Sequence, residues 1–169
     1  MAAKPLLAVV PIMVLYSGAL ACKHPVDSGP QSGQFTIDFP STPAAVMTDS
    51  LQAFVFDSAD ATNLCHELVS ARSAQNKWPA TPLAKSDPFP PCKLITSPGS
   101  VTLPPTHFGE RAIVVVGQSG GTDILIGCRR VTFGDEDVPT VITLTLIGQM
   151  GLKPTSCTTL REHCDGKEC

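Results

Sequence analysis

The sequence predicts an all-β fold: an antiparallel β-sandwich with one short helix, a long proline-rich loop and a disulfide-stapled C-terminal tail. The first observation is a hairpin signal, in which the β-branched run Arg111–Gln118 is followed by the two-glycine turn Ser119–Thr122 and a second apolar run, Ile124–Phe133. The second is a set of further short strands separated by proline-rich turns. The third is the length of 169 residues, which suits one β-rich core after removal of an export signal.

The hairpin is expected to continue into a third strand. Within the second strand the apolar positions change from even to odd numbers across Arg129 and Arg130, which predicts a β-bulge there. The polar segment Gly134–Pro139 then forms a turn, and Val141–Ile147 alternates apolar and polar residues. The third strand should therefore have one solvent-exposed face, with its inward positions at Ile142, Leu144 and Leu146.

Two strands and one helix are expected before the hairpin. Gln34–Phe39 alternates and is ended by Pro40, so it predicts a half-buried strand at the start of the folded domain. Ser50–Phe56 predicts a second strand of this type. The period then changes, and several N-cap residues precede apolar positions at helical spacing, so we expect a helix over Thr62–Arg72.

Two segments show little periodicity. Pro79–Pro105 holds eight of the 16 prolines and predicts a long ordered loop held by Cys92, with strand pieces only at Lys93–Thr96 and Ser100–Leu103. Gly151–Cys169 is polar and contains three cysteines, which predicts a tail stapled to the domain by disulfides.

The first residues predict export. Met1–Ala21 has an apolar run of about a dozen residues, short of the roughly 20 that a membrane-spanning helix needs, and ends in small residues directly before Cys22. This end resembles the lipobox of bacterial lipoproteins, whose cysteine is lipidated and becomes the mature N-terminus. Ala19–Ala21 also fits the A-x-A pattern of an ordinary signal peptidase, which would give a secreted soluble protein with a plain thiol at Cys22.

Cysteine parity favours lipidation. Of the seven cysteines, removal of Cys22 leaves six, an even number suited to three disulfides in an oxidising compartment. Six cysteines allow 15 pairings, and among them Cys65 with Cys128 would tie a crossover segment to the core sheet. The six predicted disulfide cysteines are Cys65, Cys92, Cys128, Cys157, Cys164 and Cys169.

These observations divide the chain into four parts. Lys23–Gln34 is rich in Pro, Gly, Ser and Gln, so it predicts a flexible tether between a lipid anchor and the domain. The expected location is the cell envelope, at the outer membrane, with the membrane as a partner through the lipid on Cys22. The four parts are a signal peptide (1–21), a tether (22–34), a β-sandwich domain (35–150) and a cysteine-rich tail (151–169).

One family resemblance rests on a pattern within the domain. The pattern runs from Leu103–Pro105 through Gly109–Val116 to Gly120–Gly121 and Gly127–Cys128. It resembles the transthyretin-like (prealbumin-like) sandwich domains, related in architecture to Ig-like sandwiches, of exported bacterial lipoproteins. The resemblance covers roughly Gln34–Ile147. It implies a sandwich fold and no catalytic residues, because such domains often have no assigned activity.

One segment matches a catalytic motif. Gly117–Gly121 fits G-x-S-x-G, with Ser119 as the nucleophile of an envelope serine hydrolase, and His66 and His107 are available as bases. A nucleophile elbow, however, needs a strand, a strained turn and then a helix, whereas a second strand is expected after Ser119. The hairpin-turn interpretation is therefore favoured over the hydrolase.

Metal binding is a further alternative. The tail offers a zinc set without a C-x-x-C pair, and an acidic run offers carboxylates for calcium without the spacing of a known calcium loop. Disulfides and a solvated turn are favoured instead, and no cofactor is expected. The zinc set is Cys157, His163, Cys164 and Cys169, and the acidic run is Asp135, Glu136 and Asp137.

Two aromatic residues in the proline-rich region are candidates for recognition. Trp78 and Phe89 lie on a predicted loop, where exposed aromatics often bind partners, although capping of an open sheet edge or face is the favoured interpretation. The net charge of −3 does not indicate a basic surface for binding nucleic acid. The sequence thus predicts a noncatalytic binding or structural module of the envelope, with an envelope protein or glycan as its partner.

Overall fold

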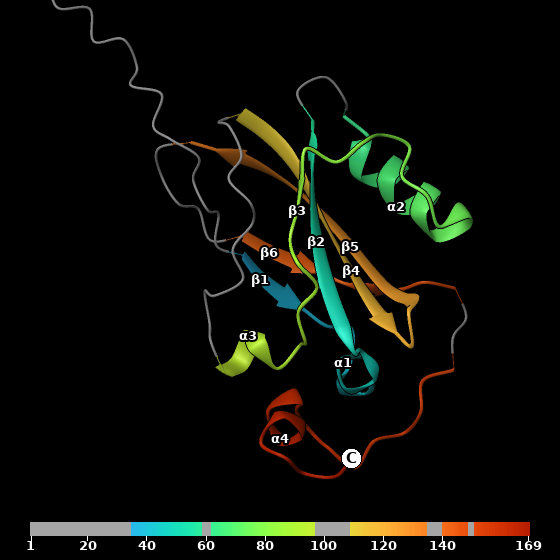
Figure 1. The fold of residues 1–169 in the computed structure, drawn as a ribbon, viewed down its shortest axis with the longest axis vertical. Helices are drawn as coiled ribbons and strands as arrows, with labels where there is room; N and C mark the ends of the chain where they lie inside the picture. The colour runs from blue at the N-terminus through green and yellow to red at the C-terminus, as the bar shows by residue number, and fades with distance from the viewer. Residues whose placement is uncertain (1–34, 59–61, 97–108, 135–139, 149–150) are drawn as a thin grey trace, which may run out of the picture.

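In a computed structural model of the chain, the described residues are 35–58, 62–96, 109–134, 140–148 and 151–169. Within them the chain is rich in β-strands with a few short helices (Figure 1), and it contains three disulfides. Several predicted features lie outside the described residues: the export signal, the tether, Cys22, the strand piece Ser100–Leu103, His107 and the acidic run Asp135–Asp137.

The larger sheet has five antiparallel strands in the order β3-β2-β4-β5-β7. Its long members are the three strands that the apolar runs predict, and each is slightly longer than expected. The two outer members are short, and one of them lies inside the proline-rich region. The bounds are β2 Ser50–Asp57, β3 Ala84–Lys85, β4 Gly109–Ser119, β5 Thr122–Phe133 and β7 Thr145–Leu146.

The predicted hairpin between β4 and β5 is confirmed. Gly120 and Gly121 have φ values of 56° and 79°, which is the left-handed region that a two-residue type I′ turn requires at both positions. The Asp49 carboxylate accepts a hydrogen bond from the Gly120 N–H, so a neighbouring segment also fixes the turn.

The β-bulge predicted at Arg129 and Arg130 is wrong. The pairing of β4 with β5 is continuous through both arginines, and the register shifts instead between Gly117 and Gln118, where Ile124 is the extra residue. The change of parity has another cause: both faces of the sheet are covered, so apolar side chains occur on both faces of β5.

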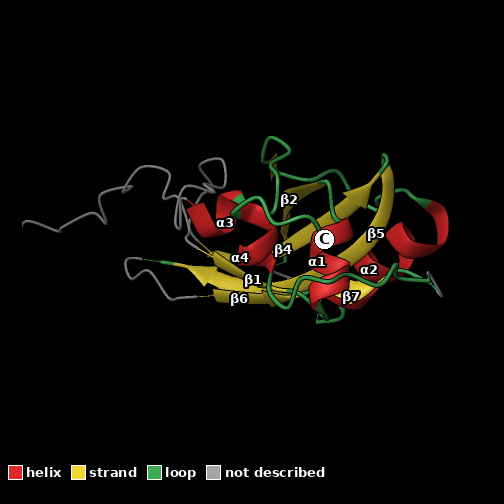
Figure 2. Cartoon of the chain, turned by 90° about the horizontal axis from the view of Figure 1, so that it is seen from below, coloured by secondary structure: helices red, strands yellow, loops and turns green. Residues whose placement is uncertain are grey.

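A second, two-stranded sheet pairs β1, Phe35–Asp38, with β6, Thr140–Thr143, in parallel (Figures 1 and 2). The single strand predicted over Val141–Ile147 is therefore divided at Leu144, and β6 and β7 pair in different sheets. The predicted alternation holds at Ile142 and Leu144, which are buried while Thr143 and Thr145 are exposed, whereas Leu146 is only half-buried.

A glycine allows the junction between β6 and β7 to approach β5 closely. A Cβ built at Gly127 would overlap the carbonyl oxygen of Thr143 and press on the side chain of Leu144. The backbone of the β6–β7 junction can therefore lie against β5 only where β5 has no side chain.

Two apolar clusters cover the two faces of the larger sheet. The first cluster joins the sheet to the second sheet and contains Phe35, Ile142 and Phe89 among its buried members. The second cluster lies under α2, Leu64–Gln75, through Leu64 and Leu68. The sheet is thus the middle layer between a helix on one face and the β1–β6 pair on the other.

The predicted helix over Thr62–Arg72 is confirmed as α2, which begins two residues later and ends three residues later. Asn76, in the left-handed conformation with φ of 52°, ends it.

One helix was expected, whereas the described chain has four. α1, Thr42–Met47, begins at Ser41, whose hydroxyl accepts a hydrogen bond from the Ala44 N–H. The strand piece expected at Lys93–Thr96 is wrong, because these residues form α3. The last helix, α4, is Leu160–Cys164 in the tail.

Candidate functional site

Three disulfides join all six cysteines that the sequence assigns to bridges. They are Cys65–Cys128, Cys92–Cys164 and Cys157–Cys169. The first ties α2 to β5, as the pairing of a crossover segment with the core sheet predicted. The second ties the tail to the proline-rich region, which confirms the expectation of a stapled tail.

The two other bridges belong to one end of the molecule, which we call the cap: residues 41–48, 90–96 and 151–169. Figure 2, seen from below, faces it, and α1, α3 and α4 lie together there. Besides Cys92–Cys164, the Thr42 hydroxyl donates to the Thr158 carbonyl at 3.0 Å, and the Lys153 N–H lies 3.1 Å from the Met47 sulfur. Three segments far apart in the sequence therefore meet in the cap.

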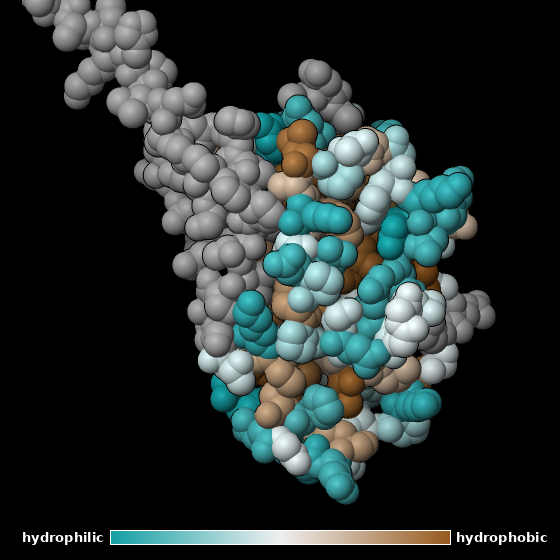
Figure 3. Space-filling model, viewed as in Figure 1, coloured by the Kyte–Doolittle hydropathy of each residue, from teal (hydrophilic) through white to brown (hydrophobic). Residues whose placement is uncertain are grey.

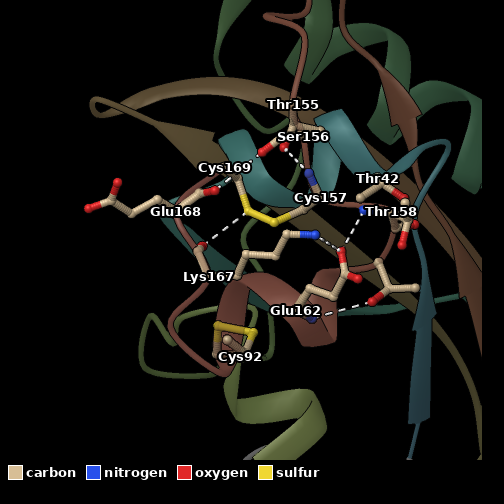
Figure 4. Close-up of a disulfide and its surroundings, with 12 residues drawn as sticks. Thr42, Cys92, Thr155, Ser156, Cys157, Thr158, Glu162, Lys167, Glu168 and Cys169 are labelled. Atoms are coloured by element: carbon tan, nitrogen blue, oxygen red, sulfur yellow. Dashed lines mark hydrogen bonds and ion pairs between the residues drawn. A yellow bond between two sulfur atoms is a disulfide. The ribbon is translucent and has the colours of Figure 1, made fainter.

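Within the cap, α4 begins with a variant of the capping box, in which Glu162 bonds the N–H of the residue before the N-cap (Figure 4). The Thr159 hydroxyl accepts from the Glu162 N–H, and the Glu162 carboxylate accepts from the Thr158 N–H at 2.8 Å and from the Lys167 ammonium at 2.9 Å. The Thr158 N–H and then the Lys167 ammonium hold the pKa of Glu162 below its ordinary value of 4.5. This network orders the loop that Cys157–Cys169 closes.

Two phenylalanines and an arginine surround Trp78, whose side chain is half-buried. Its ring packs on Phe54 and Phe56, with centroids 4.9 and 5.2 Å apart, and the Arg72 guanidinium lies 4.9 Å from its centroid. Trp78 therefore caps the second apolar cluster at the C-terminal end of α2, as the face-capping interpretation predicted.

The Arg72 guanidinium forms an ion pair with a carboxylate of the larger sheet. Its Nε lies 2.6 Å from the Asp123 carboxylate, and the Gln118 amide donates to the other oxygen at 2.7 Å. The Arg72 and Asp123 side chains are only 16% and 9% exposed. Asp123 and Gln118 were not predicted from the sequence, although both flank the two-glycine turn, because no motif marks an ion pair between a helix and a hairpin.

Phe89 is not available for recognition, because it is 5% exposed and belongs to the first apolar cluster. Its backbone exchanges two hydrogen bonds with Leu51, at 2.8 and 2.9 Å. Leu83 and Ser86 donate to β2 in the same way. The segment covers the outer edge of β2, so the edge-capping interpretation is correct for Phe89.

Ser119 ends β4 and enters the type I′ turn, so a strand follows it, and the strand–turn–helix geometry of a nucleophile elbow is absent at this position. Of its candidate bases, His66 is exposed on α2. Among the described residues no hydrogen bond joins a histidine to Ser119.

The zinc set in the tail is contradicted by the disulfides. Its three cysteines, Cys157, Cys164 and Cys169, are all in bridges, so no thiolate is available as a ligand. In the part of the chain that the structure describes, no group of three His, Cys, Asp or Glu residues could hold a metal ion.

The surface shows polar and apolar residues interspersed on the face seen in Figure 3. Among the described residues the exposed large hydrophobic side chains are Leu83 and Val141, at 56% and 52%. An open hollow of about 300 Å³ lies beside the exposed ion pair of Glu110 and Arg130, whose charged atoms are 2.7 Å apart. It is lined by Glu110, Arg130, Val131 and Thr132.

Comparison with protein-family models, with curated proteins and with solved structures found no match. Within the described ranges, no helix is long and apolar enough to cross a membrane.

Proposed function

We propose that this chain is a lipid-anchored, disulfide-stapled β-sandwich that serves the cell envelope as a noncatalytic binding or structural module. The lipid on Cys22 would hold it at the outer membrane, and the tether would place the domain close to the surface. An envelope protein or glycan would be its partner.

One observation carries the proposal. The three disulfides use six of the seven cysteines and make no use of Cys22. Disulfides persist in oxidising compartments outside the cytoplasm, which supports export. A cysteine that follows an apolar leader and is left over from a complete set of bridges is the residue that a lipidation pathway would use.

The proposal includes a sandwich arrangement of the two sheets. It is supported by the first apolar cluster, in which residues of the second sheet, Phe35 and Ile142, pack with Leu51 and Val115 of the larger sheet. The resemblance to transthyretin-like domains agrees with this arrangement. The helical cap and the parallel pairing of β1 with β6 are additions to that pattern.

Replacement of the lipidated cysteine tests the anchor. We expect Cys22→Ser to move the protein from the membrane fraction to the soluble fraction, because acyl chains contribute about 0.8 kcal/mol per buried CH₂. The mass of the N-terminal peptide should show a diacylglyceryl group on Cys22 in the wild type, and removal of the leader at Ala21 in the variant.

The matched control is Ser28→Ala, which changes the tether and leaves Cys22 in place, and it should stay in the membrane fraction. If the processed Cys22→Ser protein still pellets with membranes after a high-salt wash, the lipid is not what holds it there.

A fluorophosphonate probe tests the noncatalytic part. The purified mature protein should remain unlabelled, because a strand follows Ser119 in place of the helix of a nucleophile elbow. Labelling of the wild type that disappears in Ser119→Ala would contradict this part of the proposal and support the hydrolase alternative.

A further inference from the structure

We propose that the Cys157–Cys169 bridge is a thiol–disulfide exchange site, at which a dithiol reductant attacks the sulfur of Cys169. The inference begins from the accessibility of the six bridged cysteines. Cys169 is exposed, whereas Cys65, Cys92, Cys128 and Cys164 are half-buried and Cys157 is only 4% exposed. Exchange requires a thiolate to reach a disulfide sulfur, so this bridge offers the most accessible target of the three.

The two sulfurs of this bridge differ in access, so the attack has a direction. Cys157 is covered by its surroundings, and its N–H donates to the Thr155 hydroxyl at 3.1 Å. Cys169, by contrast, is exposed, and Figure 4 shows its sulfur bonded to that of Cys157. A reductant should therefore form its bond to Cys169 and displace Cys157.

The exchange balances with one dithiol. A reductant thiolate bonds to the Cys169 sulfur, the bond between Cys169 and Cys157 breaks, and the Cys157 thiolate leaves and takes a proton. The second thiol of the reductant, as thiolate, then attacks the reductant's own sulfur in the mixed disulfide. This step releases the Cys169 thiolate, which is protonated in turn. Two electrons and two protons pass to the protein, which gains two thiols, and the reductant leaves as its disulfide.

The residues around the Cys157–Cys169 bridge can accommodate its reduced form. The Lys167 carbonyl oxygen lies 3.3 Å from the Cys169 sulfur and can accept a hydrogen bond from the thiol that reduction produces. The α4 segment keeps its attachment through Cys92–Cys164 and its capping box around Glu162. Reduction should release the end of the loop, where the Ser156 hydroxyl donates to the Glu168 carbonyl at 3.2 Å, without detaching the helix.

The exchange site does not depend on the lipid anchor, so failure of either proposal leaves the other open to its own test. The mature protein, folded and oxidised, is titrated with dithiothreitol, quenched with an alkylating reagent and mapped by peptide mass spectrometry. We expect alkylation of Cys157 and Cys169 at reductant ratios at which Cys65–Cys128 and Cys92–Cys164 are still closed. Opening of another bridge first, or of all three together, would overturn the proposal.

The direction of attack is tested with reduced glutathione, which forms a stable mixed disulfide. The adduct should lie on Cys169, and a predominant adduct on Cys157 would contradict the proposed direction. The variant Cys157→Ala/Cys169→Ala should lose the early alkylation and keep both other bridges. Since the titration and the glutathione mapping use the wild-type chain, they decide the proposal even if this variant folds poorly.

Discussion

The larger sheet and the cap are held by different means. In the sheet, β2 and β4 pair over eight residues of β2, and side chains such as Val55, Val114 and Val115 are fully buried. In the cap, α1 has six residues, α3 four and α4 five, and neither α3 nor α4 has a buried residue. Helices of this length are not stable alone. The cap buries Ala44 and Ala45 of α1 and otherwise depends mainly on two disulfides and a few hydrogen bonds.

The difference shows what each kind of stabilisation does in one small protein. Apolar burial holds together strands that are long enough to present a continuous face. Segments rich in proline and polar residues have no such face, so a covalent bond between them restricts the unfolded chain instead. Disturbing one region should therefore leave the other largely intact.

The largest expected effect comes from the two long-range bridges, which span similar separations of 63 and 72 residues. Their loop-closure contributions, roughly 4 kcal/mol each, should differ by only about 0.1 kcal/mol. We expect Cys65→Ala/Cys128→Ala to lower the free energy of global unfolding by roughly 4 kcal/mol, because the unfolded chain is no longer restricted by this loop. Urea unfolding followed by Trp78 fluorescence measures the loss.

Cys92→Ala/Cys164→Ala serves as the matched comparison. It should change the same Trp78 transition less and make the cap sensitive to protease, because the cap opens apart from the sheet. Equal shifts for the two double variants, with the cap still protected, would show that sheet and cap unfold as one unit.

A smaller effect is expected where the second sheet crosses the larger one. Gly127→Val should destabilise the domain by about 3 kcal/mol, because the new side chain would overlap the Thr143 backbone. Gly134→Ala is the control, since its Cβ would meet nothing within 4 Å, and it should change stability by no more than about 0.5 kcal/mol. Equal urea midpoints for both variants would contradict the close approach at Gly127.

The ion pair between α2 and the hairpin should contribute less. Asp123→Asn removes the charge that faces Arg72 while it keeps the size of the side chain, and we expect a loss of about 2 kcal/mol. Glu110→Gln is the matched change in the exposed pair with Arg130, and it should cost less than about 0.5 kcal/mol. Thermal unfolding of both variants compares them, and a larger loss for Glu110→Gln would be the contrary result.

The smallest effect is confined to the cap and depends on pH. Because the pKa of Glu162 is lowered in the folded state, its contribution is complete above the ordinary value of 4.5 and is lost as pH falls from there through the lowered pKa of the folded state. Hydrogen exchange of the α4 amides should therefore speed up relative to the β4 amides as acid is added. Glu162→Gln should lose this pH dependence, whereas Glu168→Gln in the same cap should retain it.

The parts that could be predicted from the sequence depend on neighbours in the chain. The β4–β5 hairpin is a local structure whose two glycines supply the required backbone angles, and the turn followed directly from Gly120 and Gly121. The first helix could have been found too, because Ser41 precedes a proline and an alanine-rich run, which is the sign of a helix start.

The parts that could not be predicted depend on distant contacts. The parallel pairing of β1 with β6 joins residues about a hundred positions apart, and alternation within each strand does not name its partner. Lys93–Thr96 contains the β-branched residues of a strand, yet Pro90 and Pro91 precede it and Cys92 is tied to Cys164, so a helical turn forms. The network around Trp78 likewise needed the packing of α2 on the sheet to be known.

The separate stabilisation of sheet and cap is tested most directly by hydrogen–deuterium exchange of the folded mature protein, with and without enough dithiothreitol to open all three bridges. We expect amides of residues 90–96 and 151–169 to lose protection on reduction, while those of β4 and β5 lose only the part that the Cys65–Cys128 bridge contributes and remain the more protected. Loss of protection in β4 and β5 at the same rate as in the cap would contradict the account, as would a cap that stays protected after every bridge is open.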